Sequence, residues 1–399
     1  MTILGLIVEY NPFHNGHYYH LQKAKKITNA ELIIAVMSGP FVQRGEPAIF
    51  DKWTRTRMAL ESGIDLVIEL PVIYATQSAN WFASGAIALL NHLKVSHLVF
   101  GSESNSIERL DQIANLLLNE PVSFQNTLKR YLSLGHSYPK AIALTLQEMQ
   151  NGKEDFVLNP NDILGLQYLL QIKKHHSRMI ALTIQRKSTQ YHEQIFSNQT
   201  FASATAIRKA IQFNDEIERV IQYVPKVSQN LFYKSFVQRR FQYWENYYQT
   251  LKILILNQSI EQLKQIHGMV EGLESRLKES VNQAFSFEEL ISIVKTKRYT
   301  QAKLQRVFLH LLLNLTEDRV KAINVEKGPQ YIRLLGFNQK GKSYLNQIKD
   351  ELSIPLISKL SKIRSTMLDL DIQASQIYET GFKNPDYRLN EFQQKPIIL

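Results

Sequence analysis

The sequence contains no cysteine, and this absence excludes disulfide bonds and thiolate metal sites. It fits a reducing compartment. No apolar run approaches the roughly 20 residues that a membrane-spanning helix needs. The first residues, "MTILGLIVEYN", also lack the basic segment that opens a secretory signal peptide. We therefore expect a soluble, cytoplasmic protein without a membrane partner.

Internal repeats and low-complexity segments are absent as well, so the chain has no signature of a solenoid or of a long disordered linker. Its 399 residues are enough for two or three domains, and 44% of them are hydrophobic. That composition supports a sizeable buried core. The oligomeric state leaves no sign in the sequence.

The net charge of +11 is unevenly distributed. Residues 1–225 carry 21 Lys and Arg against 19 Asp and Glu, whereas residues 226–399 carry 26 against 17. A nearly neutral first half and a basic second half indicate that a polyanion binds the second half. The alternative is that these charges lie on solvated helix faces of a mildly basic protein.

Short apolar runs alternate with helical patterns through the first hundred residues. Strands are expected at 2–10, 31–39, 64–71 and 95–103, with helices at 17–26, 50–63 and 77–93. Continuous apolar strands separated by helices are typical of a parallel sheet covered on both faces. We therefore predict an α/β fold with a Rossmann-like parallel sheet, whose ligands bind at the carboxyl ends of the strands.

The sheet domain continues to about residue 225. Residues 179–186 resemble a further strand, and residues 203–212 open another helix. Beyond Pro225 the β-branched runs fade and the apolar residues take helical spacing. We expect two domains, an α/β sheet domain at 1–225 and a mainly α-helical, basic domain at 226–399.

Two histidines flank a single glycine at the first strand-to-helix turn, in "NPFHNGHYYH". Free backbone N–H groups and the helix dipole favour phosphate there, and Gly16 lets a ligand approach closely. His14 and His17 can donate hydrogen bonds to phosphate oxygens. Two other interpretations remain open: a metal site with His20 as third ligand, and a purely structural turn.

The motif "HNGH" resembles the H-x-G-H signature of the nucleotidylyltransferase superfamily, and "SATAIR" (203–208) resembles its second, phosphate-holding signature. With "AVMSGPFVQRGEPAIFDKWTRTRMAL", "DLVIELP", "FGSES" and "NPNDILGLQY", the chain resembles the bacterial tRNA(Met) cytidine acetate ligase family over essentially its whole length. The resemblance implies activation of acetate by ATP as acetyl-adenylate, then transfer of the acetyl group to N4 of the wobble cytidine of elongator tRNA(Met), giving N4-acetylcytidine. It also implies that 1–225 is an ATP-binding, nucleotidyltransferase-like catalytic domain and that 226–399 is a tRNA-binding domain.

The resemblance also implies site residues. His14 and His17 are the expected catalytic residues. The expected ATP contacts are Ile7, Val8, Glu9, Tyr10, Asn11, Pro12, Phe13, His14, Asn15, Gly16, His17, Tyr18, Tyr19, His20, Gly101, Asn161, Asp162, Arg186, Lys187, Ser203, Thr205 and Arg208. Asp162 stands where the family has Asn, which puts an amide donor there in doubt.

Four of these residues also have an interpretation that involves no ligand. Asn161, Ser203 and Thr205 can be helix caps, and Arg186 can be a solvated charge. Gly101 ends a strand where a side chain would collide with a bound nucleotide.

Basic clusters in the second half suggest where tRNA binds. Residues 290–316 contain no acidic residue, and the expected tRNA contacts there are Lys295, Lys297, Arg298, Lys303 and Arg306. Tyr299 follows Arg298 and can stack on a base. Two further clusters are Lys340 with Lys342, and Lys359 with Lys362 and Arg364. In the first half, Arg44, Lys52, Arg55 and Arg57 are expected near acetate or tRNA, or on a solvated helix.

Acetate is already an anion, so its attack on the α-phosphorus needs no general base. Mg²⁺ is expected with ATP, but no acidic cluster in the sequence identifies its ligands. The residues leave two other functions open: an adenylyltransferase acting on a small phosphorylated metabolite, and an RNA-binding protein whose nucleotide site is inactive. The sequence names no base for the amine step.

Overall fold

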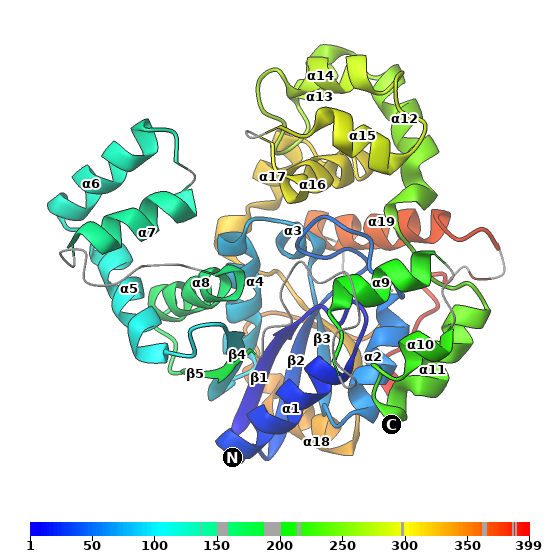
Figure 1. The fold of residues 1–399 in the computed structure, drawn as a ribbon. Coiled ribbons are helices and arrows are strands. Elements are labelled where there is room, and N and C mark those ends of the chain that lie inside the picture. Colours follow the sequence, from blue (N-terminus) through cyan, green and yellow to red (C-terminus); the bar gives the residue numbers. More distant parts are fainter. Residues whose placement is uncertain are drawn as a thin grey trace.

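A computed structural model of the chain describes residues 1–136, 138–149, 159–186, 201–213, 217–296, 299–360, 365–384, 387 and 389–399. One mixed sheet forms its centre (Figure 1). The strands are β1 (Ile3–Val8), β2 (Leu32–Ser38), β3 (Leu66–Leu70), β4 (His97–Ser102), β5 (Ile180–Gln185), β6 (Ile332–Phe337), β7 (Leu356–Ile357) and β8 (Ile397–Ile398). Their order is β5-β4-β1-β2-β3-β6-β7, and β8 pairs with β6.

Helices cover both faces of this sheet and form two groups beyond it. They are α1 (Asn15–Thr28), α2 (Lys52–Glu61), α3 (Val72–Ala75), α4 (Ala79–His92), α5 (Ile107–Asn119), α6 (Val122–Ser133), α7 (Tyr138–Met149), α8 (Pro160–Lys174), α9 (Ala204–Gln212), α10 (Ile217–Ile221), α11 (Lys226–Val237), α12 (Tyr248–Asn257), α13 (Ile260–Lys264), α14 (Leu273–Ser280), α15 (Phe287–Val294), α16 (Gln301–Leu312), α17 (Glu317–Ile323), α18 (Gln339–Ile348) and α19 (Thr366–Thr380). Short 3₁₀ turns are η1 (Trp244–Tyr247), η2 (Val325–Lys327) and η3 (Lys349–Glu351).

The central strands are buried on both faces, as their continuous apolar sequences require. Along β1, Ile3 and Ile7 pack with α4 and α8, whereas Leu4 and Leu6 pack with α1 and α9. This alternation follows from the two-residue period of a strand. The strands and helices expected in residues 1–103 are confirmed, each end lying within two residues of its expected position.

The five strands from β1 to β5 are parallel, as predicted. The second half is mainly helical, as expected, but the sequence did not predict that it also contributes β6, β7 and β8 to the sheet, with β6 antiparallel to β3. The pattern hid them for physical reasons. β6 is six residues long and carries Arg333 and Gly336, and the other two strands have two residues each. The sheet is therefore completed by residues far beyond 225.

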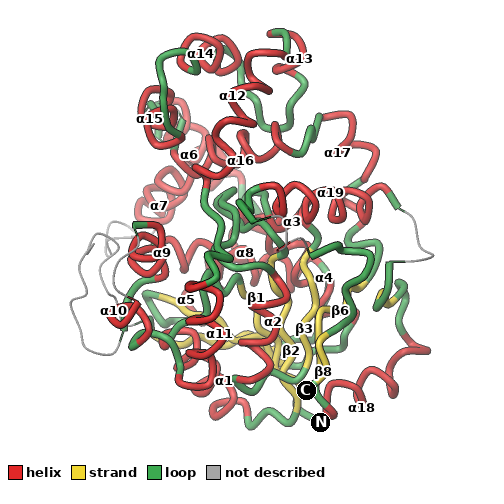
Figure 2. The backbone as a smooth tube through the Cα atoms, turned by 90° about the vertical axis from the view of Figure 1, so that its right-hand side faces the viewer, coloured by secondary structure: helices red, strands yellow, loops and turns green. Residues whose placement is uncertain are grey.

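Helices α12 to α17 of the second half form a separate group beyond the carboxyl ends of the parallel strands (Figures 1 and 2). Their buried residues, including Leu251, Leu277 and Phe308, belong to the same apolar cluster as one face of the sheet. The pair α6 and α7 projects from the other side of α8 in Figure 1. No helix in the described ranges has the length and apolarity to cross a membrane.

Candidate functional site

The turn between β1 and α1 holds the histidine motif. His14 is the N-cap of α1, and its Nδ1 accepts a hydrogen bond of 2.9 Å from the Gly16 amide. A Cβ at position 16 would lie 2.7 Å from Cε1 of His14. The glycine between the two histidines is therefore explained by the ring of His14, which folds back over it.

His14 and His17 lie face to face, with ring centroids 3.9 Å apart and an angle of 26° between planes. Tyr10 packs on His17 from the other side at 5.1 Å. Nδ1 of His17 and Nε2 of His20 are buried and have no hydrogen-bond partner among the described residues. Buried polar atoms are rarely left unpaired, so these nitrogens are suited to meet a ligand.

Burial is the largest cause that lowers the pKa of all three imidazoles. The pKa of His14 falls to about 3 and that of His20 to about 4, with the Arg186 guanidinium adding to both shifts. For His17, the neighbouring His14 and Arg186 add to burial. The three rings are thus neutral at physiological pH, and each can donate or accept a hydrogen bond.

The backbone amides at the start of α1 are not free, contrary to expectation. The Asn15 amide donates to the Tyr223 carbonyl at 2.8 Å, and the Gly16 amide donates to His14. The cause is tertiary: the segment after α10 packs against this turn, and His14 caps the helix. The imidazoles, rather than the amides, are left to meet an anion.

Arg208 joins the second signature to the histidine turn. Ser203 caps α9 by accepting from the Ala206 amide at 3.1 Å. Arg208 donates to the Asn11 carbonyl at 2.9 Å and to Thr205 Oγ1 at 3.4 Å. It also pairs with Glu46 at 3.1 Å. Two segments about 190 residues apart in sequence therefore meet through one guanidinium group.

Arg186 and Asn161 form the other side of the site, after β5 and at the start of α8. Arg186 Nη1 donates to Asn161 Oδ1 at 2.6 Å, and the Asn161 side chain donates to Glu103. The helix cap of α8 is Asn159, so Asn161 does not cap it. A Cβ at Gly101 would lie 3.1 Å from the Arg186 side chain. Gly101 thus leaves room for this arginine.

Asp162 faces away from any ligand. Its carboxylate is 1% exposed and accepts from the hydroxyl groups of Ser102 and Ser104. The Ser104 amide donates to it as well. The carboxylate therefore holds the turn after β4. None of its contacts in the structure requires the amide donor that Asn would supply.

Among the other expected ATP contacts, Glu9 accepts a hydrogen bond of 2.8 Å from the Gln43 amide. The rest that the structure describes divide into three groups. Ile7, Val8, Tyr10 and Phe13 pack in the core. Asn11, Pro12 and Asn15 hold the turn, with Asn11 Oδ1 accepting from the Ile49 amide at 2.7 Å. Tyr18 and Tyr19 are exposed. Lys187 lies outside the described residues.

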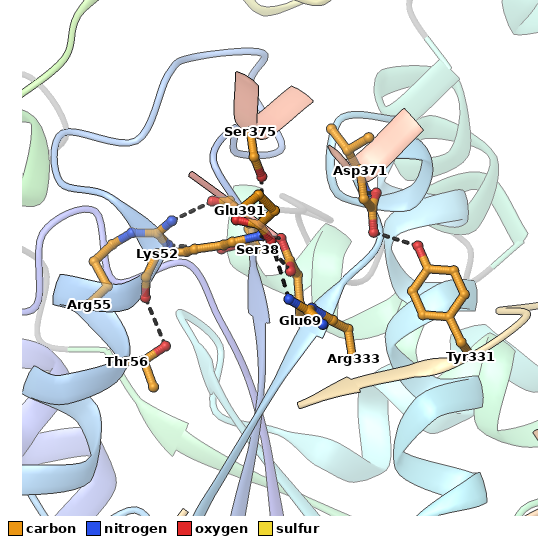
Figure 3. Close-up of polar contacts among 12 residues, drawn as sticks. Ser38, Lys52, Arg55, Thr56, Glu69, Tyr331, Arg333, Asp371, Ser375 and Glu391 are labelled. Carbon is orange, nitrogen blue, oxygen red and sulfur yellow. Dashed lines mark hydrogen bonds and ion pairs between the residues drawn. The ribbon is translucent and has the colours of Figure 1, made fainter. Parts of the chain in front are cut away.

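Two cations of α2, Lys52 and Arg55, contradict the expectation that they meet acetate or tRNA. Arg55 is fully buried and donates to the carbonyls of Phe50, Glu9, Ser38 and Gly39. Lys52 is buried between Glu69 and Glu391, with Arg333 beside Glu391 (Figure 3). Arg57 and Arg44 are exposed. Charge alone did not reveal that these two cations stabilise the interior.

The expected tRNA contacts are only partly brought together. Lys295 is exposed, and Lys303 lies 5.9 Å from the ring centre of Tyr299. Tyr299 is only 6% exposed, so it offers no face to a base. Arg306 is partly buried and donates to the Gln43 carbonyl at 3.4 Å. Lys297 and Arg298 lie outside the described residues.

The cluster at Lys340 and Lys342 lies at the wrong edge of the sheet for this site. Because β6 is antiparallel to β3, its last residue, Phe337, pairs with the first residue of β3. Helix α18 therefore begins at the amino ends of the parallel strands, opposite the histidine turn (Figure 1). Lys359 is exposed, whereas Lys362 and Arg364 lie outside the described residues.

Several residues of the site were missed by sequence reasoning. Glu103 accepts from Asn161 and from the Asp162 amide, and Glu46 pairs with Arg208. Only their positions after β4 and β2 could have pointed to them. In the described part of the chain, no group of three His, Cys, Asp or Glu residues is arranged to hold a metal ion.

The chain was then compared with known proteins. A model of the family described as HIGH Nucleotidyl Transferase matches residues 1–393. A tRNA(Met) cytidine acetate ligase of a Thermoanaerobacter species is 42% identical over 96% of both chains. The ligase of the same name from Bacillus subtilis is 40% identical over 100% of this chain and 97% of its own.

Solved structures give the same picture. The apo crystal structure of Thermotoga maritima TmcAL is 35% identical, covers 100% of both chains and superposes with a TM-score of 0.94. A second structure of that protein, bound with alpha-thio ATP, gives a TM-score of 0.92 at the same identity and coverage. The likeness therefore extends to the second half of the chain.

Proposed function

Because this chain belongs to the HIGH nucleotidyl transferase family, we propose that it is an ATP-dependent tRNA(Met) cytidine acetate ligase. One observation carries the proposal in the structure. Three neutral imidazoles lie beside Arg186 and Arg208 at the carboxyl ends of the parallel strands, and two of them, His17 and His20, have a buried nitrogen without a partner among the described residues. Such donors around one space match the negative charge of a triphosphate.

The first step joins acetate to ATP. A carboxylate oxygen of acetate attacks the α-phosphorus, the bond to the bridging oxygen breaks, and pyrophosphate leaves with that electron pair. His14 and His17 donate hydrogen bonds to the α-phosphate and the bridging oxygen. Ser203, Thr205 and Arg208 hold the leaving pyrophosphate. Because acetate is already an anion, the step needs positioning and charge stabilisation but no proton acceptor.

Mg²⁺ accompanies ATP in this proposal. The described residues contain no cluster of three or more suitable ligands, so the ion would be carried mainly by phosphate oxygens and water. Bound there, it would neutralise phosphate charge.

The second step uses tRNA. The exocyclic amine of the wobble cytidine attacks the acetyl carbonyl, and AMP leaves. An anticodon loop is single-stranded, so its base can unstack and enter the site. The helical group α12 to α17 lies at that same edge of the sheet and carries Lys295 and Lys303. These cations are suited to phosphates on either side of the base.

Two assays test the function. With acetate alone, the protein should catalyse exchange of pyrophosphate into ATP. With tRNA(Met), ATP and isotopically labelled acetate, mass spectrometry of the digested nucleosides should show labelled N4-acetylcytidine. If exchange requires a phosphorylated metabolite instead of acetate, the chain is an adenylyltransferase. If ATP is bound but neither reaction occurs, it is a binding protein.

A further inference from the structure

Glu9 is a carboxylate at the edge of the site that the first step does not use. It directly follows β1, which ends at Val8. By strand alternation it belongs with Ile3 and Ile7, on the face covered by α8. The imidazoles pack with Tyr10, which points to the other face. A ligand over the end of β1 would therefore have the imidazoles on one side and Glu9 on the other.

A hydrogen bond holds the Glu9 side chain in place, and no cation forms an ion pair with its carboxylate among the described residues. Its Oε1 accepts a hydrogen bond of 2.8 Å from the Gln43 amide. The other carboxylates near the strand ends are committed: Glu46 pairs with Arg208, and Glu103 accepts from Asn161 and the Asp162 amide. Among the ion pairs found in the described residues, none includes Glu9.

Charged groups from the β2–α2 loop, α9 and α2 surround this carboxylate. Burial raises the pKa of Glu9, and Glu46 adds to the rise, while the Gln43 amide, Arg208 and Arg44 oppose it. Arg55 of α2 donates to the Glu9 carbonyl at 2.7 Å. On the α8 side, burial is the main cause that raises the pKa of the Tyr168 hydroxyl, and the charge of Glu9 adds to this rise. The net result is a carboxylate more basic than an exposed glutamate.

We propose that Glu9 is the general base of acetyl transfer, a role that rests on the proposed function. The N4 lone pair forms a bond to the acetyl carbon, and the bond from that carbon to the AMP oxygen breaks. AMP leaves with the electron pair of that bond. The proton released from N4 passes to the Glu9 carboxylate and from there to solvent.

The alternatives to Glu9 are poorer proton acceptors. The cytosine amine gives up a proton only as its nitrogen bonds to carbon, and a base is most effective when its pKa lies near the working pH. The pKa of His14 is about 3 and that of His20 about 4. Both carboxylate oxygens of Glu103 accept amide donors and Glu46 is paired with Arg208, whereas among the described contacts Glu9 accepts through Oε1 only. Glu9 accepts one hydrogen bond through Oε1, lies at the end of β1 beside the site, and has a raised pKa.

The test separates the two steps. Glu9→Gln keeps an oxygen for the Gln43 amide, so the loop that carries Gln43 stays anchored. Preformed acetyl-adenylate is mixed with enzyme and tRNA(Met) in a single turnover. We expect Glu9→Gln to slow transfer about 100-fold and to slow acetate-dependent pyrophosphate exchange at least about tenfold less than that. The wild-type transfer rate should fall as the pH is lowered and Glu9 is protonated, and the variant should lose this dependence.

Glu46→Gln is the matched control, because it removes the neighbouring carboxylate that pairs with Arg208. It should change exchange more than transfer, the opposite split. If Glu9→Gln transfers within about threefold of wild type, or slows exchange and transfer equally, Glu9 is not the base. If the wild-type protein gives neither exchange nor acetylated tRNA, the proposed function itself is wrong, and the role of Glu9 falls with it.

Discussion

At the scale of single residues, the site gathers hydrogen-bond donors without gathering excess positive charge. His14, His17 and His20 are neutral because burial and nearby cations lower their pKa. Neutral rings can therefore pack beside Arg186 and Arg208 without charge repulsion. A triphosphate then supplies the negative charge that these arginines attract. The arrangement is prepared for the ligand before the ligand arrives.

Removal of the imidazoles tests this arrangement. His14→Ala and His17→Ala should each reduce acetate-dependent pyrophosphate exchange about 100-fold, because each removes a donor to the reacting phosphate. His92→Ala serves as control. His92 is the last residue of α4, which leads into the amino end of β4, whereas the site lies at the carboxyl ends of the strands. Exchange at the normal rate in both site variants would contradict the proposed mechanism.

The same histidines predict how stability depends on pH. Unfolded histidines take up a proton below about pH 6.5, whereas folded His14 and His20 stay neutral to about 3 and 4. The unfolded state therefore binds more protons, and the free energy of unfolding decreases as the pH falls below 6.5. Between pH 6.5 and 5.5 each group should contribute about 1 kcal/mol. Urea unfolding of the ATP-free protein measures this slope, which His20→Gln should reduce.

Sequence reasoning could predict His14, His17 and Arg208 as site residues because each belongs to a short, continuous motif. It did not find what holds them. Gly16 accommodates a ring folded back from His14, and Arg208 is oriented by Glu46 from a loop about 160 residues earlier in the chain. Such contacts depend on tertiary structure and leave no periodicity in the sequence.

At the scale of elements, the loop between β2 and α2 connects the site to the rest of the molecule. Its Gln43 and Glu46 contact Glu9 and Arg208. On the other side, a Cβ at Gly45 would lie 2.5 Å from the backbone nitrogen of Arg306 in α16. This loop therefore packs directly between the nucleotide site and the helical group, with no room for a larger residue at 45.

Arg55 fixes this loop to the ends of β1 and β2. Arg55→Met should destabilise the protein by about 3 kcal/mol or more, because three buried carbonyls and one partly buried carbonyl lose their donor. Arg57→Met is the matched control on the same helix, since Arg57 is exposed. It should change the free energy of unfolding by less than about 0.5 kcal/mol. Equal effects in urea unfolding would show that Arg55 is no more important than a surface charge.

At the scale of the whole molecule, the two halves of the chain share one sheet. β3 pairs with β6, and the buried charges of Lys52 and Glu69 meet Glu391 and Arg333 from the second half (Figure 3). The parallel strands were predictable because they are long, apolar and regularly spaced. The later strands were not, because β7 and β8 are short and because Arg333 in β6 is a residue type expected on the surface.

A fragment of residues 1–225 tests this interdependence. A division at residue 225 implies a fragment that folds and binds ATP. The shared sheet predicts the opposite, because β3 would be left as an uncovered apolar edge and Lys52 would lose one of its two carboxylates. Size-exclusion chromatography should show aggregation. A monomeric fragment that unfolds cooperatively and binds ATP would contradict this expectation.

The position of Glu391 has a consequence for synthesis of the chain. This carboxylate joins Lys52 and Glu69 only after residues 1–390 have been translated, and β8 follows it. Until residues 332–337 and Glu391 have left the ribosome, β3 is paired with β2 alone and Lys52 has one of its two carboxylates. Completion of the sheet and neutralisation of its buried lysine are therefore late events in the folding of the growing chain.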